Sequence, residues 1–161
     1  KGIAKFPIFN SSWSAKGLVI KHVIHIGVAV AIDEGLLVPV LQHADQKDLM
    51  QLGREVADLS QRARSKQLRP EEVQGGTFTI TNHGGTGSLF STPIINQPQI
   101  AILGVGAVQR RAVVINETIG IRPMAYLSLS FDHRAIDGAT ADQFMLKVKS
   151  VLEQPAWEIR A

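Results

Sequence analysis

The sequence contains no cysteine. This absence excludes disulfide bonds, zinc or iron–sulfur centres held by thiolates, and a cysteine nucleophile. It is compatible with a reducing compartment, where disulfides rarely persist. Glycine and proline occur 14 and 7 times among 161 residues, too seldom for a collagen-like or low-complexity chain.

Long apolar runs are also missing. The longest, Ile100–Val108, is far shorter than the roughly 18 residues of a membrane-spanning helix, and its glycines favour a buried strand. The first residues, Lys1–Lys5, include neither a methionine nor the apolar stretch of a signal peptide. We therefore expect no membrane association and interpret the chain as an internal part of a longer protein.

Aromatic residues make up only 6% of the chain, and 17 basic residues against 14 acidic ones give a net charge of +3. The aromatic side chains are not interleaved with basic ones, as they are on nucleic-acid-binding platforms. We therefore expect no nucleic-acid partner. With 45% hydrophobic and 19% charged residues, the chain is suited to one folded domain with a substantial core.

The spacing of apolar residues predicts the helices and strands. Between Leu49 and Ala63 the spacings are three and four, which predicts a helix with Asp45 as its N-cap and Asp48 in its first turn. A second helix is expected between Gly138 and Pro155. Strands are predicted at Leu18–His22, His25–Ile32, Leu36–Leu41, Thr77–Thr81, Ile100–Leu103, Ala112–Ile115 and Ala125–Phe131.

Turns are predicted at Asp33–Gly35, where they close a β-hairpin, and at Asn116–Gly120. Strands outnumber helices but both are substantial. The predicted fold class is α+β, with helices packed against a mostly β layer. The basic residues Arg62, Arg64 and Lys66, near the end of the first helix, are expected on a solvated face.

Several common kinds of site do not match the sequence. Gly104–Gly106 follows a predicted strand, but Gln109 occupies the third glycine position of a dinucleotide-binding fingerprint. Gly84–Gly87 lacks the Gly-Lys-Ser/Thr ending of a phosphate-binding loop. His22 and His25 lie in extended chain and face opposite sides, so we expect no metal site. The Gly-x-Ser-x-Gly elbow of serine hydrolases is absent.

One segment, Phe131–Gly138, combines a histidine with an acidic residue four positions later. His133 has the parity of the apolar strand residues if the strand continues that far, which favours an ordinary core histidine. A second interpretation is a general base, because a turn before Gly138 can bring Asp137 back toward the ring, and a preorganised imidazole accepts protons near neutral pH. The residues alone leave both interpretations open.

Residues His133–Gly138 match the His-x-x-x-Asp-Gly motif of the dihydrolipoamide acyltransferases of 2-oxo acid dehydrogenase complexes, a motif that chloramphenicol acetyltransferase shares. Thr77–Asn82, followed by Ser91–Asn96, resembles the central block of the same family. Val28–Val40 resembles its hairpin. The resemblance covers nearly the whole chain, from about residue 6 to residue 157, and the three blocks occur in the family's order.

The resemblance implies a chloramphenicol-acetyltransferase-like fold, a mixed β-sheet with flanking helices. It implies a homotrimer with active sites between subunits, and trimers that build a cubic or dodecahedral core. Residues 1–161 would be the C-terminal portion of the acyltransferase catalytic domain, N-terminally truncated, with lipoyl and peripheral-subunit-binding domains upstream. The implied partners are a lipoyl domain and, through upstream domains, a 2-oxo acid decarboxylase and dihydrolipoamide dehydrogenase. The implied location is the prokaryotic cytoplasm or the mitochondrial matrix.

The implied reaction moves an acyl group from a lipoyl-lysine arm to coenzyme A. His133 would take the proton of the coenzyme A thiol, because a thiol attacks well only when deprotonated. Thr81, aligned with the family's serine or threonine, would donate its hydroxyl to the oxyanion of the tetrahedral intermediate. Asp137 would hold the loop and the histidine. Asn82 and Gly106 are expected to contact coenzyme A, with plain turn roles as the alternative.

Other functions stay open at this point. One is a free-standing coenzyme A-dependent acetyltransferase of the same fold, and another is a non-catalytic core or docking subunit. The presence of both His133 and Asp137 argues against the non-catalytic subunit. The loop Asn82–Ser88 matches none of the acetyl, succinyl or branched-chain patterns fully, so the sequence does not fix the acyl group.

Overall fold

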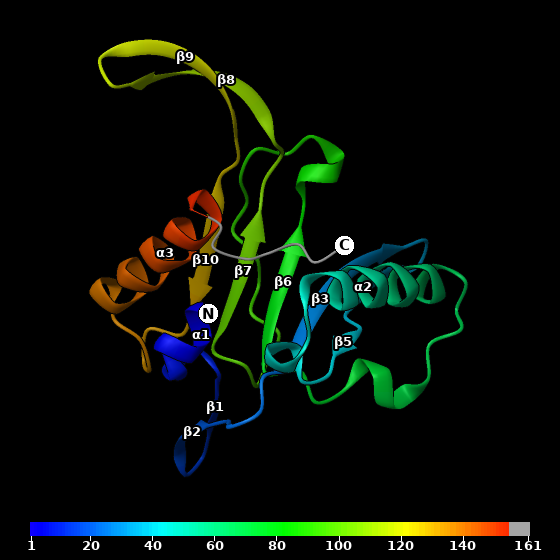
Figure 1. Cartoon of the computed structure of the whole chain (residues 1–161). Coiled ribbons are helices and arrows are strands. Elements are labelled where there is room, and N and C mark those ends of the chain that lie inside the picture. Colours follow the sequence, from blue (N-terminus) through cyan, green and yellow to red (C-terminus); the bar gives the residue numbers. More distant parts are fainter. Residues whose placement is uncertain (155–161) are drawn as a thin grey trace.

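The computed structural model describes residues 1–154, and a six-stranded mixed sheet forms its centre (Figure 1). The strand order is β10-β7-β6-β3-β4, and β5 pairs with β3 outside this path. Neighbours β3, β6 and β7 are parallel, whereas β10, β4 and β5 run antiparallel to their partners. The strands are β3 (Ile26–Ile32), β4 (Gly35–Leu37), β5 (Val40–Leu41), β6 (Phe78–Asn82), β7 (Ala101–Val105) and β10 (Leu127–Phe131).

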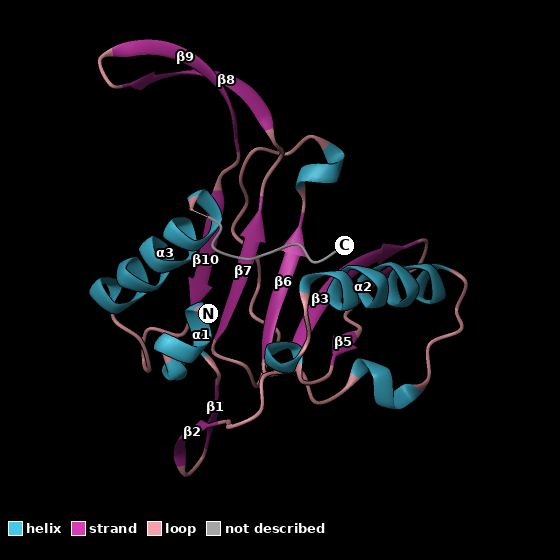
Figure 2. Ribbon diagram, in the orientation of Figure 1, coloured by secondary structure: helices cyan, strands magenta, loops and turns pink. Residues whose placement is uncertain are grey.

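Helices α1 (Gly2–Lys5) and α3 (Gly138–Glu153) contact each other, and α3 lies along β10 (Figure 2). Helix α2 (Leu49–Arg64), which is as long as α3, packs against β3. Shorter 3-10 helices within residues 1–154 are η1 (Pro7–Phe9), η2 (Ala44–Gln46), η3 (Pro70–Val73) and η4 (Gly84–Thr86).

The sheet has two chemically different faces because successive side chains of a strand alternate. In β6, Phe78 and Ile80 join the apolar core, whereas Thr79 and Thr81 belong to the opposite face. Phe144 of α3 packs against Phe78, with ring centroids 6.0 Å apart. The buried core consists of Phe9, Phe78, Ile100, Ala101, Leu103, Ile136, Ala141 and Phe144.

Two hairpins extend from this centre. Strands β1 (Ser11–Ser14) and β2 (Gly17–Ile20) form the first, and Ser12 forms an isolated bridge with Gln99, just before β7. Strands β8 (Gln109–Ile115) and β9 (Thr118–Met124) form the second, which projects far beyond the sheet (Figure 1).

The structure confirms the predicted hairpin at residues 33–35, since Ile32 of β3 pairs with Gly35 of β4. The predicted strand Leu36–Leu41 is wrong in its continuity, because the chain leaves the strand at Val38 and Pro39. A proline has no N–H group to donate to a strand neighbour.

The predicted turn at residues 116–120 is shorter than expected. Only Asn116 and Glu117 separate β8 from β9, and both have left-handed φ angles, 48° and 62°. Strand β9 was missed because its first residues fall within the predicted turn, and because Pro123 is unusual inside a strand.

The N-cap of α2 is Asp48, and the prediction of Asp45 is wrong because Asp45 lies in η2. The Asp48 carboxylate accepts a hydrogen bond from the Gln51 N–H at 2.7 Å, and the Gln51 side chain accepts one from the Asp48 N–H at 3.0 Å. This reciprocal pair is a capping box, which satisfies two N–H groups at once.

Arg62 does not lie on a purely solvated face as predicted. Its guanidinium donates to both carboxylate oxygens of Glu72 at 2.7 and 2.8 Å and also pairs with Asp58. Hydrogen bonds from Arg62 hold the pKa of the Glu72 carboxyl well below its ordinary value. The pair therefore joins the end of α2 to η3 at neutral pH.

We expected no membrane association. Among residues 1–154, no helix is both long enough and apolar enough to cross a bilayer.

Replacing Phe144 should weaken the core strongly. Phe144 is 2% exposed, and its ring stacks on Phe9 with a centroid separation of 4.0 Å. We expect Phe144→Ala to lower the free energy of unfolding by about 3–5 kcal/mol, because a large cavity forms between α3 and the sheet. Urea unfolding followed by circular dichroism measures this change. Gln143→Ala, at an exposed position of the same helix, is the control, and equal losses in the two variants would contradict the assigned core.

Candidate active site

His133 lies on a tight turn that follows β10. The Asp132 N–H donates to the Ile100 carbonyl at 2.8 Å, so the chain stays bonded to its neighbour one residue beyond the strand. The Asp132 carbonyl then accepts hydrogen bonds from the N–H groups of Ala135 at 3.0 Å and Ile136 at 3.1 Å. Ile136 is buried in the core and anchors the far side of the turn.

The side chain of His133 is exposed. The core-histidine interpretation is therefore wrong, because β10 ends at Phe131 and its alternation does not extend to His133. The imidazole lies near the Phe131 ring, with centroids 5.5 Å apart and ring planes at 40°. An exposed imidazole on a fixed turn is accessible to a substrate and can exchange protons with it.

Asp137 caps α3. Its carboxylate accepts a hydrogen bond from the Thr140 N–H at 2.7 Å, the usual role of an aspartate at an N-cap. Hydrogen bonds from the backbone and side chain of Thr140 hold the pKa of Asp137 below its ordinary value, and the neighbouring His133 adds to this effect. Asp137 thus fixes the start of the helix while remaining within electrostatic reach of the candidate base.

Thr81 and Asn82 occupy the end of β6. Thr81 is half-buried and lies between Ala29 of β3 and Gly104 of β7. The Asn82 side chain is exposed, and its carbonyl oxygen accepts a hydrogen bond from the Gly84 N–H at 2.9 Å. Asn82 therefore has the turn role that the sequence left open, and its contact with coenzyme A stays a prediction.

Gly106 is buried against other backbone of the same chain. A Cβ atom added there would lie 1.8 Å from the Leu89 carbonyl oxygen and 3.2 Å from that of Tyr126. The backbone that comes close to Gly106 is therefore that of the loop at Leu89. A contact between Gly106 and coenzyme A remains a prediction, but the packing of Leu89 is enough to explain why this position needs a glycine.

Two polar atoms that the sequence did not single out lie near Gly104, the residue of β7 that pairs with Thr81. Within residues 1–154, His83 Nε2 and Ser128 Oγ are buried without a hydrogen-bond partner. Both residues face Gly104, where an added Cβ would be 2.4 Å from Ser128 Oγ and 3.2 Å from His83 Cε1. The other ring nitrogen of His83 contacts Ser91 Oγ at 3.0 Å.

The structure does not bring Thr81 and His133 together within one chain. Thr81 is level with Gly104, and Gly104 is level with Ser128 of β10. Because β10 is antiparallel to β7, the chain runs from Ser128 toward the start of β6 before it reaches His133. The three steps from Ser128 to Phe131 alone span about 10 Å at roughly 3.3 Å per residue. One substrate atom cannot contact both groups of the same chain.

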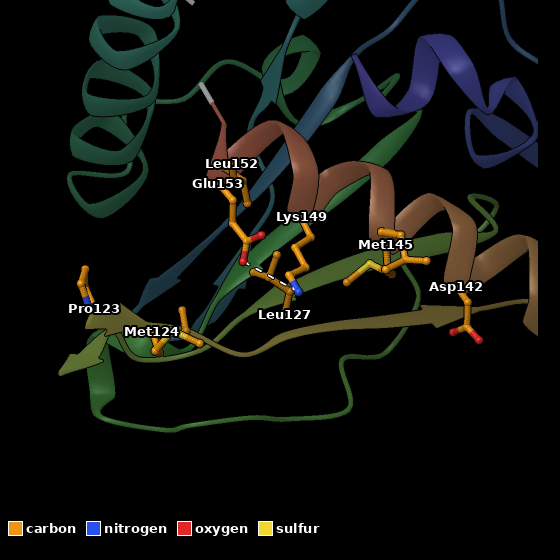
Figure 3. A pocket seen from close by; sticks show the side chains of 10 residues that line it. Pro123, Met124, Leu127, Asp142, Met145, Lys149, Leu152 and Glu153 are labelled. Carbon is orange, nitrogen blue, oxygen red and sulfur yellow. Dashed lines mark ion pairs between the residues drawn. The ribbon is translucent and has the colours of Figure 1, made fainter. Parts of the chain in front are cut away.

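A cavity of about 690 Å³ lies between α3 and the segment from Pro123 to Leu127 (Figure 3). Its walls are mainly apolar, with Met145 and Leu152 on the helix side, and Lys149 and Glu153 form an ion pair of 3.9 Å beside it. None of the predicted site residues lines it, namely His133, Asp137, Thr81, Asn82 and Gly106.

We expected no metal site. Across the described residues 1–154, no group of three or more histidine, aspartate or glutamate side chains is placed to hold a metal ion.

Residues 1–158 match the family described as 2-oxoacid dehydrogenases acyltransferase (catalytic domain), and the chain belongs to this family. The succinyltransferase component of the 2-oxoglutarate dehydrogenase complex of Bartonella vinsonii subsp. berkhoffii is 45% identical over 153 residues, which cover 95% of this chain and 37% of that relative. The acetyltransferase component of the pyruvate dehydrogenase complex of Mycobacterium bovis is 45% identical over 159 residues, 94% of this chain and 29% of that relative. The chain thus spans little more than a third of these relatives at most.

Solved structures share the fold. A probable dihydrolipoamide acetyltransferase of Listeria monocytogenes superposes with a TM-score of 0.94 at 38% identity, covering 99% of this chain and 68% of that one. The dihydrolipoamide acetyltransferase of Azotobacter vinelandii and a cubic core of the pyruvate dehydrogenase multienzyme complex each give 0.90 at 43% identity, covering 93% of this chain and 63% of theirs. A chloramphenicol acetyltransferase gives 0.55 at 17%, covering 94% and 72%, so the predicted fold class is confirmed.

Removing the Asp137 carboxylate should weaken the start of α3. We expect Asp137→Ala to lower the midpoint of thermal unfolding at neutral pH, because the Thr140 N–H loses its acceptor, whereas Asp137→Asn keeps an oxygen there. Since folding lowers the pKa of Asp137, its charge stabilises above the ordinary aspartate range, and the benefit is lost as pH falls through the folded pKa. Melting curves at neutral and acidic pH measure both effects. An Asp137→Ala protein with unchanged melting and unchanged activity would contradict both roles.

Proposed function

We propose that this chain is a catalytic part of a dihydrolipoamide acyltransferase that moves an acyl group from a lipoyl-lysine arm to coenzyme A. The observation that carries the proposal is the exposed His133 on a turn anchored by the sheet and by α3, in a chain that matches the acyltransferase family over residues 1–158. The 45%-identical relatives are components of 2-oxo acid dehydrogenase complexes, which favours this function over a free-standing acetyltransferase.

The spacing of three residues supports their assignment. The Azotobacter vinelandii structure addressed the role of a serine, a histidine and an asparagine in that enzyme's catalytic mechanism. In that enzyme the histidine lies as many positions after the serine as His133 lies after Thr81 in this chain. The asparagine there lies as many positions after the histidine as Asp137 lies after His133. A hydroxyl is kept at the first position, and an oxygen acceptor at the third.

The proposed mechanism is a direct transfer between two thiols. His133 takes the proton of the coenzyme A thiol while the sulfur attacks the acyl thioester carbon. The hydroxyl of Thr81 donates a hydrogen bond to the oxyanion that forms. The intermediate then expels the dihydrolipoyl sulfur, which receives the proton back from His133, so the base is regenerated. Asp137 keeps the turn and the helix in place without exchanging a proton.

Each site is proposed to form between two copies of the chain. Thr81 and His133 lie toward opposite ends of the sheet, so a substrate can contact both only if they come from different subunits. A cyclic trimer gives every His133 a neighbouring Thr81. The structural similarity to a cubic core supports the further assembly of such trimers, with a dodecahedral core as the alternative.

The acyl group and the partners belong to the whole protein. Succinyl- and acetyltransferase relatives are equally similar to this chain, so the full-length protein should be assayed with acetyl-, succinyl- and isobutyryl-dihydrolipoamide. We propose a lipoyl domain as the acyl donor, and a 2-oxo acid decarboxylase and dihydrolipoamide dehydrogenase as partners bound through other domains. Asn82 and Gly106 remain the proposed coenzyme A contacts. The proposed compartment is the prokaryotic cytoplasm or the mitochondrial matrix.

His133→Ala should abolish transfer without disturbing the assembly. A positioned general base contributes about 10²–10⁴-fold to a rate. The ring of His133 is exposed and contacts the core through Phe131 at its edge, so we expect the variant to stay folded. The test is the steady-state rate of coenzyme A acylation by the full-length variant, with the assembly checked by native mass spectrometry. His22→Ala, at another exposed histidine, is the control. A near wild-type rate in intact His133→Ala protein would refute the proposed function.

Mixing two inactive variants tests the shared site. Chains carrying His133→Ala and chains carrying Thr81→Ala are combined by co-expression in varied ratios. With random assembly at equal amounts, roughly a quarter of the interfaces in a cyclic trimer hold both intact groups, so activity should approach about a quarter of wild type. Activity that follows a straight line between the two parents, in mixtures shown by mass to exchange chains, would contradict the inter-subunit site.

A further inference from the structure

Arg134 folds back onto Asp132 across the residue between them, His133. Its Nε donates to Asp132 Oδ1 at 2.9 Å, its Nη2 donates to Oδ2 at 2.6 Å, and its backbone N–H donates to Oδ1 at 3.0 Å. The side-chain hydrogen bonds from Arg134 hold the pKa of the Asp132 carboxyl below its ordinary value, so the pair is ionised at neutral pH. The two neighbours of His133 are therefore fixed to each other.

The guanidinium of Arg134 makes a second contact with its flat face. Its Cζ lies over the indole ring of Trp13, 4.6 Å from the ring centroid. A guanidinium can bind a carboxylate with its edge and stack on an aromatic ring with its face at the same time, which a lysine ammonium cannot do. The Arg134 side chain is 63% exposed, whereas Trp13 is half-buried and packs against the core, so the stack lies at the edge of the core.

Both ends of this stack are bonded to the same short stretch of chain. The Trp13 N–H donates to the Pro98 carbonyl at 3.2 Å, Ser12 forms a bridge with Gln99, and the Asp132 N–H donates to the Ile100 carbonyl at 2.8 Å. The β1–β2 hairpin and the turn that carries His133 are thus held side by side at the entrance of β7.

We propose that Asp132, Arg134 and Trp13 form a clamp that fixes the turn and thereby orients the His133 imidazole for proton transfer. This inference rests on the proposed function, since it assigns positioning residues to the same site. Arg134 and Trp13 need not contact substrate. They restrict the peptide units on either side of His133, whose side chain is exposed in the single chain.

The test uses kinetics of the full-length assembled protein. Arg134→Lys keeps the positive charge but loses the bidentate pair and the flat stack, and Trp13→Leu keeps apolar volume but loses the ring. We expect kcat to fall about tenfold to a hundredfold in each, the range by which small misplacement of a catalytic group slows a reaction. The KM for coenzyme A and the midpoint of the pH–rate profile should stay unchanged. Trp13→Phe keeps an aromatic face and should restore most of kcat.

Three further measurements separate positioning from other roles. In the double variant with Arg134→Lys and Trp13→Leu, kcat should fall only as far as in the more damaging single variant. The two factors should not multiply, because both substitutions remove the same contact between Arg134 and Trp13. Arg54→Lys, at an exposed position of α2, should leave kcat unchanged. Thermal melting and native mass spectrometry, run on every variant, confirm that kcat is compared between intact assemblies.

Defined outcomes would overturn the clamp. Wild-type kcat in both Arg134→Lys and Trp13→Leu would refute it, and a raised KM for coenzyme A at unchanged kcat would assign Arg134 to substrate binding instead. If Trp13→Leu fails to assemble, Arg134→Lys and Trp13→Phe still decide the question. An inactive His133→Ala protein beside fully active clamp variants leaves the proposed function intact, whereas an active His133→Ala protein refutes that function and the clamp together.

Discussion

The register of β6, β7 and β10 is the constraint on which the proposed chemistry depends. Thr81, Gly104 and Ser128 form one row across three strands, and β10 runs away from that row toward His133. Because β10 is antiparallel to β7, each residue of β10 after Ser128 lies farther from the Thr81 hydroxyl, and His133 follows the last of them. Because backbone hydrogen bonds fix this register, side-chain motion cannot close the gap. Chemistry that needs both groups therefore requires a second copy of the chain.

A series of local contacts connects the core to the exposed His133. Phe144 and Ala141 bury one face of α3, and this packing holds the helix against the core. Asp137 caps that first turn, and buried Ile136 stands directly before it. The turn around His133 is thus held by the helix on one side and by the end of β10 on the other. An exposed side chain obtains a defined position because its neighbours in sequence are the ordered ones.

The sequence predicted the features that arise from local patterns. The alternation of Phe78 and Ile80 with Thr79 and Thr81 indicated both a strand and its two faces, and both are present. The start of α2 was missed by three residues, because a cap is decided by which carboxylate reaches a free N–H, and Asp48 alone meets Gln51 in that way. The order in which distant strands pair carries no local signal. Only the family resemblance supplied the mixed sheet.

The role of a single residue is hard to predict from sequence where that residue packs against a distant part of its own chain. Gly106 has the small size that a ligand approach requires, yet its open side is taken by Leu89, seventeen positions earlier in sequence. Arg134 shows the converse. No role was predicted for Asp132 or Arg134, because opposite charges two residues apart in a strand are a common pattern at protein surfaces. Their bonding becomes visible only because β10 stops at Phe131, so that a turn folds the two side chains together around His133. Where β10 ends therefore determines whether these three residues form an ordinary strand surface or a turn in which His133 is held from both sides.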